Sequence, residues 1–220
     1  MKDKTNLVIQ YILGFPKSLY VNFRLLKPLE AIRMPIFISH KTSIRSLSGK
    51  VVFDSPSFAC LKIGFGLTPL TDFRYDRSIL NIKGEIIVHG KSRFGAGSKI
   101  HVFGTLEIGA NFNMTGKSTI VCHKRITFGT NALISWNVLL MDTDQHTITT
   151  LDDTIINPDK QITLGSNVWI CSGTSILKGV TITNNIVIGA HSHITKDLIQ
   201  ENAIYAGNPA KLVKKNIKWR

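Results

Sequence analysis

The chain has 220 residues, of which 43% are hydrophobic, enough to bury the core of one domain. Its net charge of +13 favours anionic partners, but no helix-turn-helix, zinc-finger or RNP-like spacing points to nucleic acid. The three cysteines, Cys60, Cys122 and Cys171, lack CxxC spacing and predict free, buried thiols in a reducing compartment. No apolar run approaches the ~20 residues that span a bilayer, so we expect a cytoplasmic protein.

Residues 1–35 differ in pattern from the rest of the chain. Apolar side chains recur there at helical spacing: Val8, Ile12, Phe15, Leu19, Phe23 and Leu26. The segment 7–15 imitates the core of a signal peptide, but Gln10 interrupts it and no A-x-A cleavage site follows. Two interpretations of this helical segment stay open. It either caps the domain that follows, or its basic and apolar residues attach the protein peripherally to the inner face of a membrane.

From about residue 80, aliphatic side chains recur at every sixth position. The longest run is Leu164, Ile170, Ile176, Ile182, Ile188 and Ile194. A period of six fits neither an α-helix nor a two-sided strand, but it arises when three short strands complete each turn of a parallel β-helix. The register slips by two residues between 100 and 108 and again between 120 and 128, which indicates insertions at corners. We therefore predict an all-β fold, a parallel β-helix over residues 36–205. A β-sandwich, the alternative, would show period-two alternation.

Residues 142–161 interrupt the repeat, and interruptions of solenoids commonly carry function. The segment opens with Asp142-Thr143-Asp144-Gln145-His146. A histidine beside carboxylates has what a general base needs, because a carboxylate orients the ring and stabilises its protonated form. We therefore expect His146 to be catalytic, with Asp144 or Asp142 as the orienting group. The sequence does not choose between the two.

The end of the chain leaves the repeat through the turn-forming Gly207-Asn208-Pro209. We expect a short basic helix within the tail, residues 206–220. Just before it, His191 and His193 alternate as a pair of metal ligands would, but no third ligand follows at suitable spacing. No metal site is predicted, and the other histidines besides His146 are interpreted as ordinary surface or core residues.

Three segments resemble the hexapeptide-repeat acyltransferases. They are ISWNVLLMDTDQH (134–146), ITLGSNVWICSGTSILKGVTITNNIVIGAHSHITKD (162–197) and AIYAGNPAKLV (203–213). The resemblance implies a left-handed coil, a homotrimer, and acetyl-CoA as acetyl donor in a groove between subunits. The Asp-x-Asp-x-His form and the basic, apolar N-terminus are most similar to O-acetyltransferases of cell-surface polysaccharides. This implies a sugar or polysaccharide acceptor from a capsule, O-antigen or exopolysaccharide.

The resemblance also assigns roles to single residues. His146 matches the general base of direct acetyl transfer, without an acyl-enzyme. The residues that match positions contacting acetyl-CoA are Ser172, Ala190, Thr195, Lys196 and Lys211, while Trp169 either lines the same groove or packs between coils. Two alternatives remain: N-acetylation of a nucleotide-linked amino sugar, and a non-enzymatic β-helix that serves as an assembly scaffold.

Overall fold

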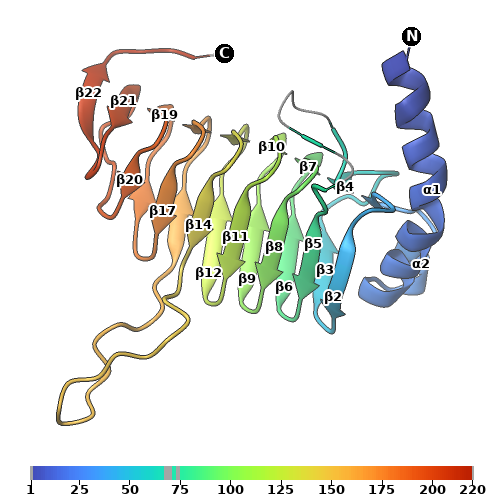
Figure 1. Cartoon of the computed structure of the whole chain (residues 1–220), viewed down its shortest axis with the longest axis horizontal. Coiled ribbons are helices and arrows are strands. Elements are labelled where there is room, and N and C mark those ends of the chain that lie inside the picture. Colours follow the sequence, from blue (N-terminus) through green and yellow to red (C-terminus); the bar gives the residue numbers. More distant parts are fainter. Residues whose placement is uncertain (1, 67–70, 73–74, 220) are drawn as a thin grey trace.

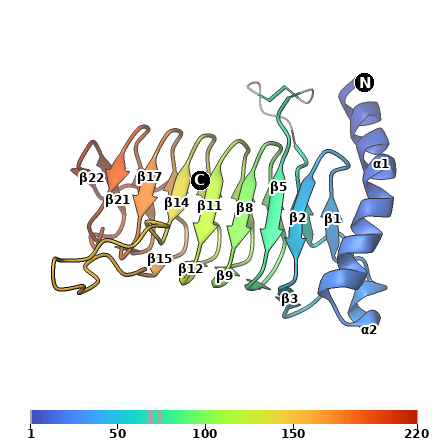
Figure 2. The same cartoon turned by 60° about the horizontal axis from the view of Figure 1, so that its bottom comes forward.

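The computed structural model describes residues 2–66, 71–72 and 75–219. The chain winds into a stack of triangular coils whose three sides are parallel sheets (Figures 1 and 2). Sheet A runs in the order β1 (Ile36–Ile38), β4 (Leu61–Ile63), β7 (Ser92–Phe94), β10 (Phe112–Met114), β13 (Leu133–Ile134), β16 (Trp169–Ile170), β19 (Ile186–Ile188), β21 (Ala203–Ala206) and β22 (Lys211–Lys215). Sheet B comprises β2 (Ser43–Leu47), β5 (Ile79–Ile82), β8 (Lys99–Val102), β11 (Thr119–Cys122), β14 (Leu139–Met141), β17 (Ser175–Leu177) and β20 (His193–Ile194). Sheet C comprises β3 (Lys50–Phe53), β6 (Glu85–Val88), β9 (Thr105–Ile108), β12 (Arg125–Phe128), β15 (Ile162–Leu164) and β18 (Thr181–Ile182).

The strand register places the six-residue repeat in the core. In sheet B, Ile120 pairs with Ile100 on one side and with Leu140 on the other, and all three are fully buried. These partners are 20 residues apart, whereas Leu164 and Ile182 in sheet C are 18 apart. The two extra residues of the longer coils lie at the corner between sheets B and C, where the expected insertions are found. The prediction of a parallel β-helix is confirmed.

Two helices, α1 (Lys2–Leu25) and α2 (Pro28–Ala31), lie beside the first coil (Figure 1). Since β1 has no strand on its outer side, α1 offers polar side chains to its backbone. The Asn22 amide donates to the carbonyl of Ile36 at 2.6 Å and accepts from the Ile36 N–H at 3.1 Å. The Ser18 hydroxyl accepts from the Ile38 N–H at 2.9 Å. No helix in the described part of the chain is long and apolar enough to cross a membrane.

The tail differs from the prediction, because no helix forms within residues 206–219. Lys211–Lys215 is instead the strand β22, which pairs antiparallel with β21 after a turn at Gly207. Strand β21 is the last parallel strand of sheet A, so a helix there would leave its outer N–H and C=O groups unpaired. The backbone of β22 satisfies them, and its lysines are typical of a protected sheet edge.

Candidate functional site

Residues 142–161 leave the coil at the corner between sheets B and C, joining β14 to β15 at the bottom of Figure 1. In the preceding coils this corner is a short turn, at Lys83-Gly84, Phe103-Gly104 and His123-Lys124. Each turn donates its N–H groups to carbonyls of the next coil, as Phe103 does to Cys122 and Thr105 does to Lys124. The loop breaks this pattern. At its start the chain turns outward, so the carbonyls that would accept the N–H groups of the His123-Lys124 corner are missing.

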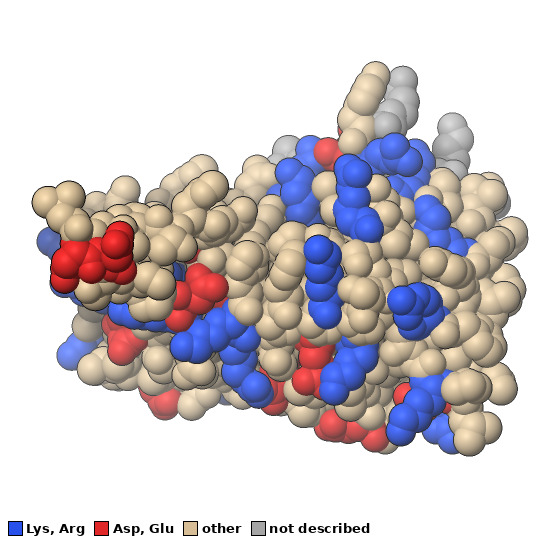
Figure 3. All heavy atoms as spheres, turned by 90° about the horizontal axis from the view of Figure 1, so that it is seen from below, with Lys and Arg blue, Asp and Glu red and all other residues tan. Residues whose placement is uncertain are grey.

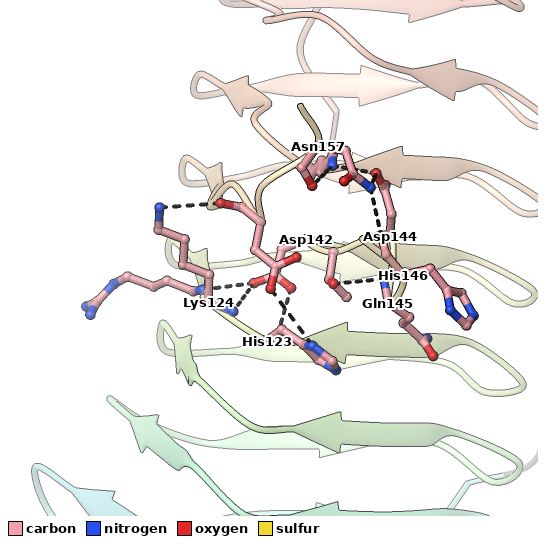
Figure 4. Close-up of polar contacts among 11 residues, drawn as sticks. His123, Lys124, Asp142, Asp144, Gln145, His146 and Asn157 are labelled. Atoms are coloured by element: carbon pink, nitrogen blue, oxygen red, sulfur yellow. Dashed lines mark hydrogen bonds and ion pairs between the residues drawn. The ribbon is translucent and has the colours of Figure 1, made fainter. Parts of the chain in front are cut away.

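The buried carboxylate of Asp142 replaces those carbonyls. One oxygen accepts the N–H of His123 at 2.7 Å, and the other accepts those of Lys124 and Arg125, both at 2.8 Å. Three backbone donors are thereby satisfied by one charged group. Asp142 therefore holds the corner beneath the loop, and its oxygens face away from His146 (Figure 4).

Asp144 is engaged with the next coil rather than with the imidazole. Its carboxylate accepts from Lys178 Nζ at 2.5 Å and from Asn157 Nδ2 at 2.8 Å. These two hydrogen bonds hold the pKa of Asp144 below its usual value. The Asn157 amide also donates to the carbonyl of His146 at 2.8 Å, so this hydrogen bond joins the outgoing and returning segments at the base of the loop. The expectation that Asp142 or Asp144 orients the imidazole is not met, because both carboxylates are occupied elsewhere.

His146 itself is exposed, and its ring is directed away from both carboxylates (Figure 4). It lines a hollow of about 260 Å³ together with His123, Thr143 and Asn157. Within the described residues, no hydrogen bond to the imidazole ring is found. Both ring nitrogens are thus accessible to a substrate, as a proton acceptor requires.

The positions expected to contact acetyl-CoA fall into three groups. Thr195, Lys196 and Lys211 line one hollow of about 270 Å³ at the C-terminal end of the stack. Ser172 and Ala190 lie on successive coils at another corner, between sheets A and B. Trp169 lies apart on sheet A, where its indole N–H donates to the Ser135 hydroxyl at 3.2 Å and its ring contacts Trp219.

The comparisons with known proteins agree with this architecture. No protein-family model matches the chain. It is 40% identical to the galactoside O-acetyltransferase of Escherichia coli K12, over 55% of this chain and 56% of that protein. It is 34% identical to a putative acetyltransferase of Dictyostelium discoideum, over 56% of this chain and 70% of that protein. The chain belongs to the hexapeptide-repeat acyltransferases.

A further relative of this acyltransferase is the polysialic acid O-acetyltransferase of Escherichia coli O1:K1, 34% identical over 63% of this chain. The chain spans about half the length of the first curated relatives it matches, between 41% and 63%. Among solved structures, the polysialic-acid-specific acetyltransferase NeuO superposes with a TM-score of 0.64 at 24% identity, covering 83% of this chain and 80% of NeuO. The expected left-handed parallel β-helix is therefore the fold of this acyltransferase.

Two residues of this site in the acyltransferase, His123 and Lys178, are not among those that the sequence predicts. The sequence predicts an ordinary surface or core role for His123, yet this residue lines the same hollow as His146. Its position in the two-residue corner insertion next to the loop was the signal available. Lys178 is 34 positions from its partner Asp144, and nothing in the local pattern indicates that pair.

Proposed function

We propose that this acyltransferase transfers the acetyl group of acetyl-CoA to a sugar hydroxyl of a cell-surface polysaccharide precursor. The observation that carries the proposal is the exposed imidazole of His146, which lines a hollow at the base of the loop that interrupts the coil. The relatives named above act on galactosides and polysialic acid, which are both sugars with free hydroxyls.

In the proposed reaction, an unprotonated ring nitrogen of His146 accepts the proton of the sugar hydroxyl. The hydroxyl oxygen attacks the thioester carbonyl and forms the new C–O bond. The tetrahedral intermediate then collapses, the C–S bond breaks, and the imidazolium returns its proton to the departing CoA thiolate. The Asp144–Lys178 and Asn157 contacts fix the backbone that bears His146, so they position the base without touching the ring.

The cysteines support direct transfer over an acyl-enzyme. Burial raises the pKa of the Cys122 thiol, and the neighbouring Asp142 charge raises it further. Burial also raises the pKa of Cys171. A thiol with a raised pKa carries little of the thiolate that nucleophilic catalysis needs. Free thiols at all three cysteines also agree with the reducing environment of the cytoplasm, where we place the protein.

We further propose that the enzyme works as a homotrimer with its sites between subunits. In one chain, the hollow of His146 shares no lining residue with the hollow of Thr195, Lys196 and Lys211. A thioester that reached both sets would bridge two hollows, which packing of a second subunit against this one can bring together.

We propose that α1 also contacts an anionic membrane surface at its periphery. One face of α1 packs on the first coil, while Ile12, Tyr20 and Phe23 on the other are at least half exposed. The cations Arg24 and Lys27 at its end are exposed as well. Co-sedimentation should be greater with anionic than with zwitterionic vesicles, and Ile12→Asp with Phe23→Asp should abolish the difference. If the double variant still pelleted with anionic vesicles as much as the wild type does, the contact would be contradicted.

The test of the catalytic assignment is CoA release in the presence of acceptor sugars. His146→Ala should lower kcat by about 10²–10⁴-fold, the usual contribution of a general base. The matched control is Asp153→Asn in the same loop, whose side chain is exposed; we expect its turnover to be unchanged. Near-wild-type turnover of His146→Ala with an unchanged melting temperature would overturn the mechanism. Stability of the acetylated product to mild base would show an amide and favour N-acetylation.

A further inference from the structure

The corner between sheets B and C continues from the candidate active site toward the N-terminal end of the stack. We propose that three side chains on this corner, Lys83, Phe103 and His123, and one on the adjoining strand β8, His101, form a platform that binds an acidic saccharide acceptor. We refer to these four residues as the corner platform. The inference rests on the proposed function, because it names the acceptor surface of the same site.

The rings of the corner platform form a continuous stack. The ring centroids of Phe103 and His123 are 5.0 Å apart, those of Phe103 and His101 are 4.5 Å apart, and those of His101 and His123 are 5.7 Å apart. The Lys83 ammonium lies 4.7 Å from the centroid of the Phe103 ring. Burial, followed by the nearby charges of His123 and Lys83, lowers the pKa of His101, which favours its neutral form. The Asn81 amide donates to Nδ1 of His101 at 2.9 Å, so a neutral ring keeps its Nε2–H to donate to a saccharide oxygen.

The stack connects two hollows on the surface. His123 lines the hollow that contains His146, and Phe103 and Lys83 line the next one, of about 490 Å³. The two hollows share no lining residue, and the ring contact between Phe103 and His123 links them. The Phe103 side chain is 40% exposed at this junction. The apolar C–H face of a pyranose packs on such a ring, while its hydroxyls reach the imidazoles and water. One sugar can thus reach His146 while the next unit rests on Phe103.

The charges along the corner favour an acidic saccharide over a neutral one. Figure 3 views the molecule from below, the side of this corner in Figure 1, and shows Lys and Arg along the coils with Asp and Glu among them. One carboxylate, that of Asp159, lines the hollow of His146 at 3.9 Å from His123 Nδ1. Two of these cations are paired, Lys50 with Glu85 at 2.8 Å and Arg125 with Glu107. By contrast, Lys83 and Lys124 are exposed and make no ion pair with a carboxylate of the described chain. These two cations remain for the carboxylates or phosphates of an acceptor.

The test compares acetyl transfer to sialic acid oligomers and to neutral galacto-oligosaccharides. Phe103→Ala should raise the KM for the oligomer by up to about tenfold, the value of one aromatic stacking contact, while the KM for acetyl-CoA and kcat stay near wild type. Phe103→Trp should retain the low KM. Lys83→Ala should raise the KM for the acidic oligomer and reduce its salt dependence, with little effect on the neutral one.

Two matched controls lie away from the corner: Phe58→Ala, an exposed phenylalanine, and Lys91→Ala, an exposed lysine between sheets C and A. Neither should change the KM for an acceptor.

Titration calorimetry of His146→Ala with the same oligomers separates the platform from the chemistry, because that variant keeps the corner intact. If this variant binds the oligomers and a further Phe103→Ala substitution weakens the binding, the platform is supported even if His146 is not the base. Turnover with a KM for the oligomer that Phe103→Ala leaves unchanged overturns the platform and leaves the proposed function standing. Absence of binding to both saccharides also overturns it, as does a change confined to the KM for acetyl-CoA.

Discussion

At the scale of single residues, Asp142 is the most consequential side chain beneath the loop. Its two oxygens accept three backbone N–H groups, from His123, Lys124 and Arg125. In Asp142→Asn, an amide NH₂ would face at least one of these buried donors, and the charge that strengthens the remaining bonds is lost. We expect a loss of about 2–4 kcal/mol in the free energy of unfolding, measured by chemical denaturation.

The same substitution at Asp153 provides the control for this prediction. Asp153 lies in the same loop, and its side chain is exposed. Asp153→Asn should change the free energy of unfolding by no more than about 0.5 kcal/mol. Should Asp142→Asn prove as stable as this control, the corner would not depend on the buried carboxylate.

The loop residues differ in how far the sequence determines their roles. His146 was predicted because the interruption is visible as a break in a six-residue period, and the chemistry of a histidine in such a loop is general. The role of Asp142 was not predicted, because it depends on the three-dimensional stacking of the coils. The chain turns outward at the loop, so the carbonyls that would accept the N–H groups of the preceding corner are missing, and only the stacked coils show which N–H groups need a partner. Asp144 lies as near to His146 in the sequence as an orienting carboxylate would, yet its hydrogen-bond partners in the structure are Lys178 and Asn157.

At the scale of elements, the coils are joined on sheet C by a ladder of charged side chains. His89 lies between two carboxylates, with Nδ1 at 2.7 Å from Asp54 and Nε2 at 3.0 Å from Glu107. These hydrogen bonds raise the pKa of His89 above its ordinary value. The stabilisation is therefore complete below the unfolded-state pKa of about 6.5 and is lost as the pH rises through the folded-state pKa.

Because the partners are partly exposed, we expect this contribution to be about 0.2–1 kcal/mol. The measurement is the difference in unfolding free energy between wild type and His89→Gln, at about pH 6 and about pH 9. The difference should be present at the lower pH and smaller at the higher one. A difference that is independent of pH would show that His89 contributes packing alone.

The elements also differ in how well the sequence predicted them. Inward columns recur at a fixed spacing, so the β-helix and its corner insertions are readable from aliphatic positions alone. The structure of the tail cannot be read from the sequence in this way, because the segment KLVKK is compatible with a basic helix or with a strand. The open edge of β21 decides in favour of the strand β22. The corner positions 83, 103 and 123 recur every 20 residues, but their residue types differ, so the sequence does not predict the corner platform.

At the scale of the whole molecule, the proposed trimer makes a prediction that one chain cannot satisfy. His146 lines one hollow, and Lys196 and Lys211 line another. If each site takes its base from one subunit and its cofactor contacts from the next, then His146→Ala and the double variant Lys196→Glu/Lys211→Glu disable different halves of a site. Refolded together in equal amounts, the two inactive proteins should form mixed trimers. A site is intact when an unaltered base faces an unaltered groove, which random assembly yields for about one quarter of the interfaces. Recovery of about one quarter of wild-type activity, with a trimeric mass by sedimentation, is the expected result. Mixed trimers without activity would instead place both groups of residues at one site within a single subunit.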